Sequence, residues 1–109
     1  MSNWITVCKQ TDLSPSTGLC ALHEGEQVAI FYCGLTTELY AVSNYDPIGD
    51  ANVLSRGIMG SIGDDVVVAS PLYKQHFNLK TGECLEEPEH RLKTYPVRIE
   101  EGEVQLQAA

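Results

Sequence analysis

The stretch SPLYKQHFNLKTGECL, Ser70–Leu85, carries most of the information about the fold. It begins with a loop, Ser70–Gln75, in which Pro71 restricts the backbone. The next residues, His76–Leu79, have the composition of a short strand. That strand pattern ends at KTGE, residues 80–83, which predicts a tight turn because glycine readily takes a positive φ. A loop held between short strands and glycine turns is typical of a domain built from β-strands.

Short β-branched or aromatic segments bounded by turn residues recur along the rest of the chain and are predicted to be strands. They are Trp4–Cys8, Gly18–Leu22, Gln27–Cys33, Glu38–Ser43, Asp65–Ala69, Tyr95–Glu100 and Glu103–Gln107. No long segment has helical periodicity, and only Asp12–Ser16 is predicted to form a helical turn, since Asp and Ser cap helices well. The sequence therefore predicts one all-β domain over residues 1–109, a small antiparallel sandwich or barrel.

The charge of the chain limits its partners. Lys and Arg number 7 against 15 Asp and Glu, and the formal net charge is −8. Binding to nucleic acid or to an anionic membrane requires an excess of basic groups, so neither is expected as a partner. No apolar run approaches the roughly 18 residues that span a bilayer. The N-terminus does not show a basic segment followed by an apolar one, so a cytoplasmic location is expected.

The cysteines and histidines do not form a metal-binding pattern. Cys8, Cys20, Cys33 and Cys84 contain no CxxC pair, and the three histidines are equally dispersed. Zinc sites favour short ligand spacings, and disulfide frameworks belong to secreted chains. We therefore expect plain thiols. A metal bound through the oxygens of Asp46 and Asp50 is a minor alternative.

Two connections are longer than a simple meander of strands needs. They are Asn44–Met59 and Ser70–Gln75. Loops held on a rigid sheet often carry function. Neither loop contains a Gly-x-Ser-x-Gly nucleophile elbow or a glycine-rich phosphate loop. No residue is predicted to be catalytic, and the isolated chain is not expected to be an enzyme.

These two loops and their flanking strands resemble the Rieske-type ferredoxin domain. The resembling segments are LYAVSN (39–44), DVVVAS (65–70), FNLKTGEC (77–84) and the closing YPVRIEEGEVQLQ (95–107). In that family the first loop carries Cys-x-His and the second Cys-x-x-His, and together they bind a [2Fe–2S] cluster through two thiolates and two imidazoles. The resemblance implies a Rieske-like iron–sulfur-protein fold with both loops at the cluster-binding end.

At the matching positions this chain has different residues. The resemblance places Asp46 and Ile48 at the first Cys and His positions, and Ser70 and Tyr73 at the second pair. Ile48 has no donor atom, the two hydroxyls stay protonated near neutral pH, and a carboxylate is a hard ligand. We therefore predict no [2Fe–2S] cluster. Ile48, Leu72 and Tyr73 are expected to fill its volume as an apolar plug.

A closer resemblance covers nearly the whole chain. NWITVCK (3–9), AVSNYDPIGDANVLSRG (41–57) and KTYPVRIEEGEVQL (93–106) resemble the small, cluster-free subunits of the cytoplasmic, assimilatory-type NADH-dependent nitrite reductases. The resemblance implies a large subunit that carries FAD, a [4Fe–4S] cluster and sirohaem and that reduces nitrite to ammonium. The small chain would carry no cofactor and would dock on that subunit and support it.

The resemblance also suggests where docking would occur. In Rieske ferredoxins the cluster tip faces the redox partner, so residues in and beside the two loops are candidate contacts: Tyr45, Arg56, Tyr73, Lys74 and Gln75. An ordinary polar loop, with Arg56 paired to local acids, is the alternative for these residues. For the chain as a whole, the alternatives are an adaptor or regulatory domain of another oxidoreductase, and a ferredoxin-type electron carrier with an unusual centre.

Overall fold

The computed structural model describes residues 3–15, 17–33, 38–72 and 74–107. These residues form antiparallel strands and two short 3₁₀ helices. The strands are β1 (Trp4–Lys9), β2 (Gly18–His23), β3 (Glu26–Tyr32), β4 (Leu39–Ser43), β5 (Tyr45–Asp46), β6 (Ala51–Asn52), β7 (Ile58–Ile62), β8 (Asp65–Ala69), β9 (His76–Asn78), β10 (Val97–Glu100) and β11 (Glu103–Gln107). The 3₁₀ helices are η1 (Gln10–Asp12) and η2 (Leu54–Arg56). The prediction of an all-β fold is confirmed.

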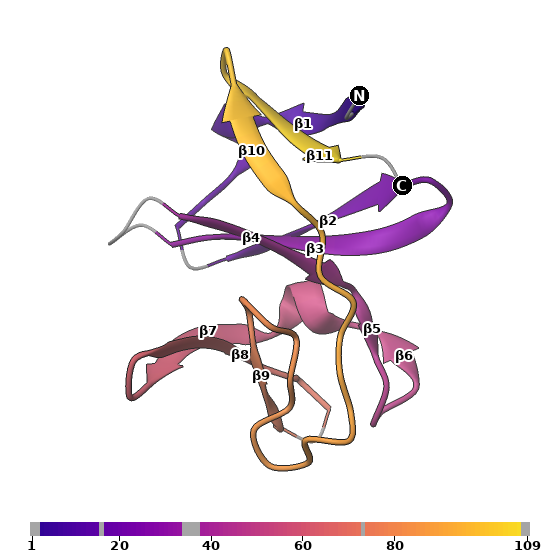
Figure 1. The fold of residues 1–109 in the computed structure, drawn as a ribbon, viewed down its shortest axis with the longest axis vertical. Helices are drawn as coiled ribbons and strands as arrows, with labels where there is room; N and C mark the ends of the chain where they lie inside the picture. The colour runs from indigo at the N-terminus through magenta and orange to yellow at the C-terminus, as the bar shows by residue number, and fades with distance from the viewer. Residues whose placement is uncertain (1–2, 16, 34–37, 73, 108–109) are drawn as a thin grey trace.

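The sheets are stacked in layers along the long axis (Figure 1). One sheet has the order β1-β11-β10, a central sheet has the order β2-β3-β4, and a third has the order β7-β8-β9. The small β5–β6 hairpin lies beside the third sheet, at the end of the molecule far from both termini (Figure 1). No helix among the residues described is long and apolar enough to cross a membrane.

The central strand β3 is buried on both faces. Val28, Ala29, Ile30 and Phe31 all have an exposed fraction of 0%. Because side chains alternate along a strand, Val28 and Ile30 pack into the core shared with the β1-β11-β10 sheet. Ala29 and Phe31 pack into the core shared with the β7-β8-β9 sheet. Burial on two sides explains why this strand reads as an unbroken apolar run.

The predicted strands are present, with ends that differ by a few residues. The last hairpin begins at Val97 instead of Tyr95, because Pro96 has no amide to donate to a ladder. Its turn places Glu101 and Gly102 at φ of 51° and 79°, the pattern of a two-residue hairpin loop. The predicted helical turn at Asp12–Ser16 is wrong over the described residues 13–15. The turn is η1 instead, where the Asp12 carboxylate accepts the Lys9 amide at 2.9 Å.

Three short strands were not predicted. β5, β6 and β7 lie wholly or largely within the segment read as the loop Asn44–Met59 and the bend after it. β5 and β6 are each only two residues long, too short to give a periodic pattern. β7 contains Gly60 and most of its residues are exposed, so it lacks the apolar alternation of a half-buried strand.

The first of the two long loops is anchored to the central sheet by Asn44 and by a glycine contact. The buried Asn44 side chain accepts the Ser55 amide at 2.7 Å and donates to Gln27 Oε1 at 3.0 Å. Gly18 in β2 lets η2 approach closely, since a Cβ there would lie 2.3 Å from the carbonyl oxygen of Ser55 and 2.8 Å from Phe31 Cε1. The position of η2, and therefore of Arg56, depends on this contact.

A pair of glycine substitutions tests this packing. We expect Gly18→Ala to lower the free energy of unfolding by about 1–3 kcal/mol, because the new methyl group meets backbone atoms that cannot move away. Gly60→Ala is the matched control, since a Cβ there meets no atom within 4 Å. Its stability should be unchanged or raised by up to about 1 kcal/mol. Urea unfolding measures both, and equal effects would contradict the close approach of η2.

Candidate functional site

The two loops meet through a buried pair of polar side chains. The Ser70 hydroxyl donates a hydrogen bond to Oδ2 of Asp46, which lies 24 residues earlier in the sequence. The exposed fractions are 0% for Asp46 and 1% for Ser70. These are the two positions that the resemblance matches to cysteines, and the structure brings them into direct contact.

The Asp46 carboxylate is satisfied by its own loop as well. Its Oδ1 accepts the amide of Ile48 at 2.8 Å and that of Gly49 at 3.1 Å. Its main-chain oxygen accepts the Asp50 amide at 2.8 Å. A buried carboxylate is costly unless donors surround it, and here two amides and a hydroxyl fill that role. Asp46 therefore organises the β5–β6 loop from the inside.

The second loop closes on Ser70 in a similar way. The Ser70 hydroxyl accepts the Leu72 amide at 3.3 Å while it donates to Asp46. The Ser70 amide donates to the carbonyl of Gln75 at 2.9 Å, and the Lys74 amide donates to the carbonyl of Ser70 at 3.0 Å. Lys74 takes a left-handed conformation with φ of 61° to make this bond.

The predicted apolar plug is only partly present. Ile48 is half-buried and packs against the core shared by the central sheet and the β7-β8-β9 sheet. Leu72 lies against Gly49, where a Cβ would be 2.4 Å from Leu72 Cδ1, but it remains 44% exposed. Leu72 therefore contacts the first loop but is only partly buried, whereas Asp46 and Ser70 are fully buried between the loops. Tyr73, the third predicted plug residue and a docking candidate, lies outside the described residues.

The other docking candidates divide into two groups. Arg56 and Lys74 are exposed and line the same groove. The Tyr45 hydroxyl donates to Asp50, and this hydrogen bond is the main cause of a raised Tyr45 pKa. The Gln75 side chain is engaged elsewhere, since it donates to Glu87 Oε2 at 3.3 Å.

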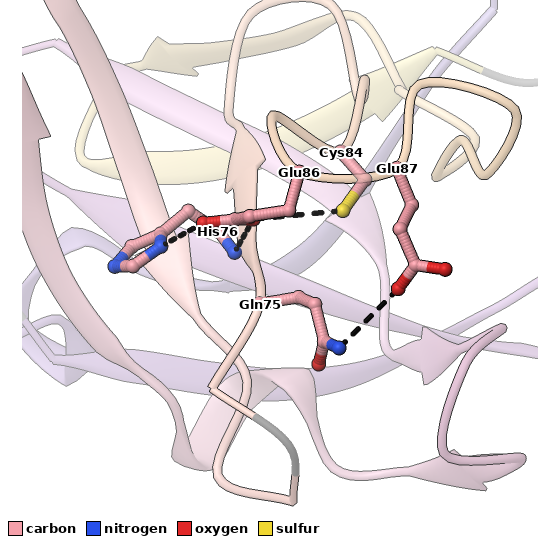
Figure 2. A network of polar contacts seen from close by, with 5 residues as sticks. All are labelled: Gln75, His76, Cys84, Glu86 and Glu87. Carbon is pink, nitrogen blue, oxygen red and sulfur yellow. Dashed lines mark hydrogen bonds and ion pairs between the residues drawn. The ribbon is translucent and has the colours of Figure 1, made fainter.

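A network of hydrogen bonds that the sequence did not predict lies beside the second loop (Figure 2). Glu86 accepts the His76 amide at 2.8 Å through Oε1 and contacts the His76 ring Nδ1 at 2.6 Å through Oε2. The buried Cys84 thiol donates to the same Oε1 at 3.8 Å. Burial acts to raise the pKa of Glu86, but the hydrogen bonds from His76 outweigh it and hold that pKa below its usual value.

The acidic segment Glu86–His90 is largely exposed, yet two of its carboxylates also bond to the second loop and to β9. Glu86 fixes the start of β9, and Glu87 holds Gln75 at the end of the loop (Figure 2). The feature that could have indicated this network is the tight turn after β9, which brings the chain back so that Phe77 pairs with Cys84. That pairing brings Glu86 beside His76.

Comparisons with known proteins agree with this arrangement. The model of the Rieske-like [2Fe-2S] domain matches residues 3–107. The nitrite reductase (NADH) small subunit of Salmonella typhimurium is 46% identical over 106 residues, which cover 97% of this chain and 98% of the relative. The chain belongs to the Rieske-like domain family, among the nitrite reductase small subunits. The resemblance seen in the sequence is confirmed.

Two further relatives of this Rieske-like chain are informative. The solution structure of the nitrite reductase [NAD(P)H] small subunit of Erwinia carotovora is 46% identical, covers 100% of this chain and 84% of its own, and has a TM-score of 0.82. A nitrite reductase [NAD(P)H] large subunit of Klebsiella oxytoca is 36% identical over 101 residues, which cover 93% of this chain but 10% of that subunit.

The residues of the two loops do not fit the cluster for which the Rieske-like family is named. Such a cluster needs two thiolates and two imidazoles. Residues 44–59 and 70–75 contain no cysteine and no histidine. The oxygens of Asp46 and Ser70 are already bonded to each other, and Ile48 offers no donor. The loop end is instead a closed, hydrogen-bonded surface.

A double-mutant cycle tests the bond between the loops. Ser70→Ala should lower the free energy of unfolding by about 1–3 kcal/mol, because it leaves a buried carboxylate oxygen without its donor. Combined with Asp46→Asn, it should show a coupling energy of about 1 kcal/mol or more. Ser61→Ala on the exposed strand β7 is the control and should be neutral. Additive effects of the two loop substitutions would contradict a direct bond.

The contact between Glu86 and His76 predicts a pH dependence. Because the folded-state pKa of Glu86 is lowered, its contribution to stability is present above its unfolded pKa and is lost as the pH falls through the folded value. At pH 7 we expect Glu86→Gln to cost about 0.5–1 kcal/mol, a modest amount because the carboxylate is nearly half exposed and therefore screened. The deficit should shrink below about pH 4, where wild type also loses the charge.

Thermal unfolding between pH 7 and pH 3 measures this effect. Glu89→Gln removes a charge from the same acidic segment and serves as the control, with no pH-dependent deficit expected. A Glu86→Gln deficit that stays constant over the whole range would show that the carboxylate charge does not stabilise the fold.

Proposed function

We propose that this chain is the small subunit of an NAD(P)H-dependent nitrite reductase that converts nitrite to ammonium. Its role is to dock on the large subunit and to support it, without carrying a redox centre. The chain acts as one domain over residues 1–109. The relationship with the Klebsiella oxytoca large subunit is the observation that carries this proposal most directly.

That relationship indicates where the domain works. A segment related to 93% of this chain makes up 10% of the Klebsiella large subunit. Covalent fusion keeps two domains at a high effective concentration, which favours a contact between them. In a separate small subunit the same neighbourhood must be reached by docking. A partner other than the large subunit has no comparable support.

The proposal assigns the redox chemistry to the large subunit. FAD, a [4Fe–4S] cluster and sirohaem are expected there, and electrons pass from NAD(P)H through these groups to nitrite. The loop end of the small chain offers oxygen donors that are engaged with each other and with main-chain amides. This is unfavourable for an electron carrier with an unusual centre, since iron–sulfur units prefer thiolates. An adaptor for a different oxidoreductase is the remaining alternative.

A cytoplasmic location belongs to the same proposal. Cys8, Cys20 and Cys84 are free thiols, and burial raises the pKa of Cys8 and of Cys84. A raised pKa keeps a thiol protonated and unreactive at neutral pH. Unpaired cysteines are typical of proteins in a reducing compartment.

Co-expression of the tagged chain with its own large subunit tests the proposal. We expect the two to co-elute in a fixed ratio, and nitrite-dependent oxidation of NADH to be lower or less stable in large subunit purified alone. The isolated chain should be colourless and free of iron by elemental analysis. Iron with visible absorbance in the isolated chain would favour the electron carrier. No retention of the large subunit would favour the adaptor.

A further inference from the structure

A groove with a volume of about 450 Å³ lies between the η2–β7 segment and the loop after β8. Three groups that are cationic or can become so line it, each from a different element: Arg56 from η2, Lys74 from the loop and His76 from β9. None of the described residues that line the groove is acidic. This is an unusual concentration of basic groups in a chain with a net charge of −8.

The two permanent cations of the groove have no partner among the residues that the structure describes. The ion pairs of those residues are His23 with Glu24, His76 with Glu86 and Lys93 with Glu26. Arg56 and Lys74 make no side-chain hydrogen bond or ring contact there either, whereas Arg98 bonds Gln105 and lies over Trp4. The alternative in which local acids satisfy Arg56 is therefore not seen. Both charges are available to an incoming group.

The backbone at Lys74 is a second and independent observation. Its φ of 61° is a conformation that glycine adopts freely and that lysine adopts at an energetic cost. The bond from its amide to the Ser70 carbonyl requires this turn but not a lysine side chain. Lysine is an unfavourable residue for this backbone conformation, and its side chain has no partner among the described residues. The two observations together suggest that the side chain has a role outside the domain.

The histidine of the groove is held in a fixed orientation. Glu86 occupies Nδ1 of His76, so the opposite edge of the ring is the one left for a ligand (Figure 2). With Nδ1 in contact with a carboxylate, Nε2 is the ring nitrogen that can meet a group in the groove. Arg56, Lys74 and His76 can thus act together on one anion.

The groove also has an apolar side. Ile58 lines it and is 76% exposed at the start of β7, which pairs only with β8 among the described strands. A free inorganic anion would leave Ile58 in water. A nucleic acid would bring many phosphates against an acidic chain. A protein segment that carries a carboxylate beside apolar residues would satisfy both the charges and Ile58.

We propose that this groove receives an Asp or Glu side chain of the large subunit, on a segment that covers Ile58. The inference rests on the proposed function and assigns its docking contact. It separates Arg56 and Lys74 from the other candidates, because Tyr45 is engaged by Asp50 and Gln75 by Glu87. Charge complementarity of this kind fixes register and orientation at an interface.

Binding of charge-reversal variants to the purified large subunit tests the groove. Arg56→Glu and Lys74→Glu should each raise the Kd at least about tenfold at low salt, and the difference should shrink as salt is added. Lys80→Glu is the matched control, a lysine in another exposed turn, and should change the Kd less than twofold. All three variants should unfold at the wild-type temperature, because these side chains are exposed and make no ion pair with any of the described residues.

A zero-length cross-link identifies the contact directly. A carbodiimide activates a carboxylate, and a lysine amine within an ion pair then displaces the urea to leave an amide bond. Mass spectrometry of the wild-type complex should find Lys74 joined to an Asp or Glu of the large subunit. If the wild-type chain binds the large subunit, the two charge-reversal variants bind equally well and the cross-links involve only other lysines, the groove assignment is overturned. The proposed function would still stand. Wild type that does not bind would overturn the proposed function itself.

Discussion

The loop end of the molecule depends on the hydrogen bond from the Ser70 hydroxyl to the Asp46 carboxylate. Both side chains are buried, and each also receives main-chain amides of its own loop. One contact therefore couples two loops that are separate in sequence. If it were removed, a carboxylate would remain beside the apolar core with one oxygen unpaired, which costs far more than the bond contributes when intact. The two loops therefore stay in contact, because separating them would leave the buried Asp46 carboxylate without this donor.

This bond explains how a Rieske-like frame persists with a different loop chemistry. In the family that the fold resembles, metal–ligand bonds would tie the loops, whereas here hydrogen bonds converge on Asp46 and Ser70. The loop positions are supported from below by Asn44, which anchors η2, and by Glu86, which fixes the start of β9. The result is a preformed surface, and a preformed surface loses little entropy when a partner binds.

The sequence predicted the strands well because their signals are local. Short apolar segments between turn residues mark β2, β3, β4 and β8, with β-branched residues most frequent in β3 and β8. The resemblance placed Asp46 and Ser70 at the loop end. What failed were features set by distant contacts. β7 lacks an apolar alternation because most of its residues are exposed. The role of Glu86 arises only because the chain folds back and brings it beside His76. The contact between Asp46 and Ser70 spans 24 residues and has no local signature.

The distribution of charge favours one orientation of the loop end toward a partner. A chain with a net charge of −8 is repelled by an acidic surface in most orientations, and the groove that holds Arg56 and Lys74 favours the orientation in which these two residues face it. Repulsion elsewhere therefore adds specificity to a contact that is itself small. Where two domains belong to one chain, covalent linkage supplies proximity and even a weak contact suffices. A separate small subunit has no linker, so its affinity must come from contacts such as those in this groove.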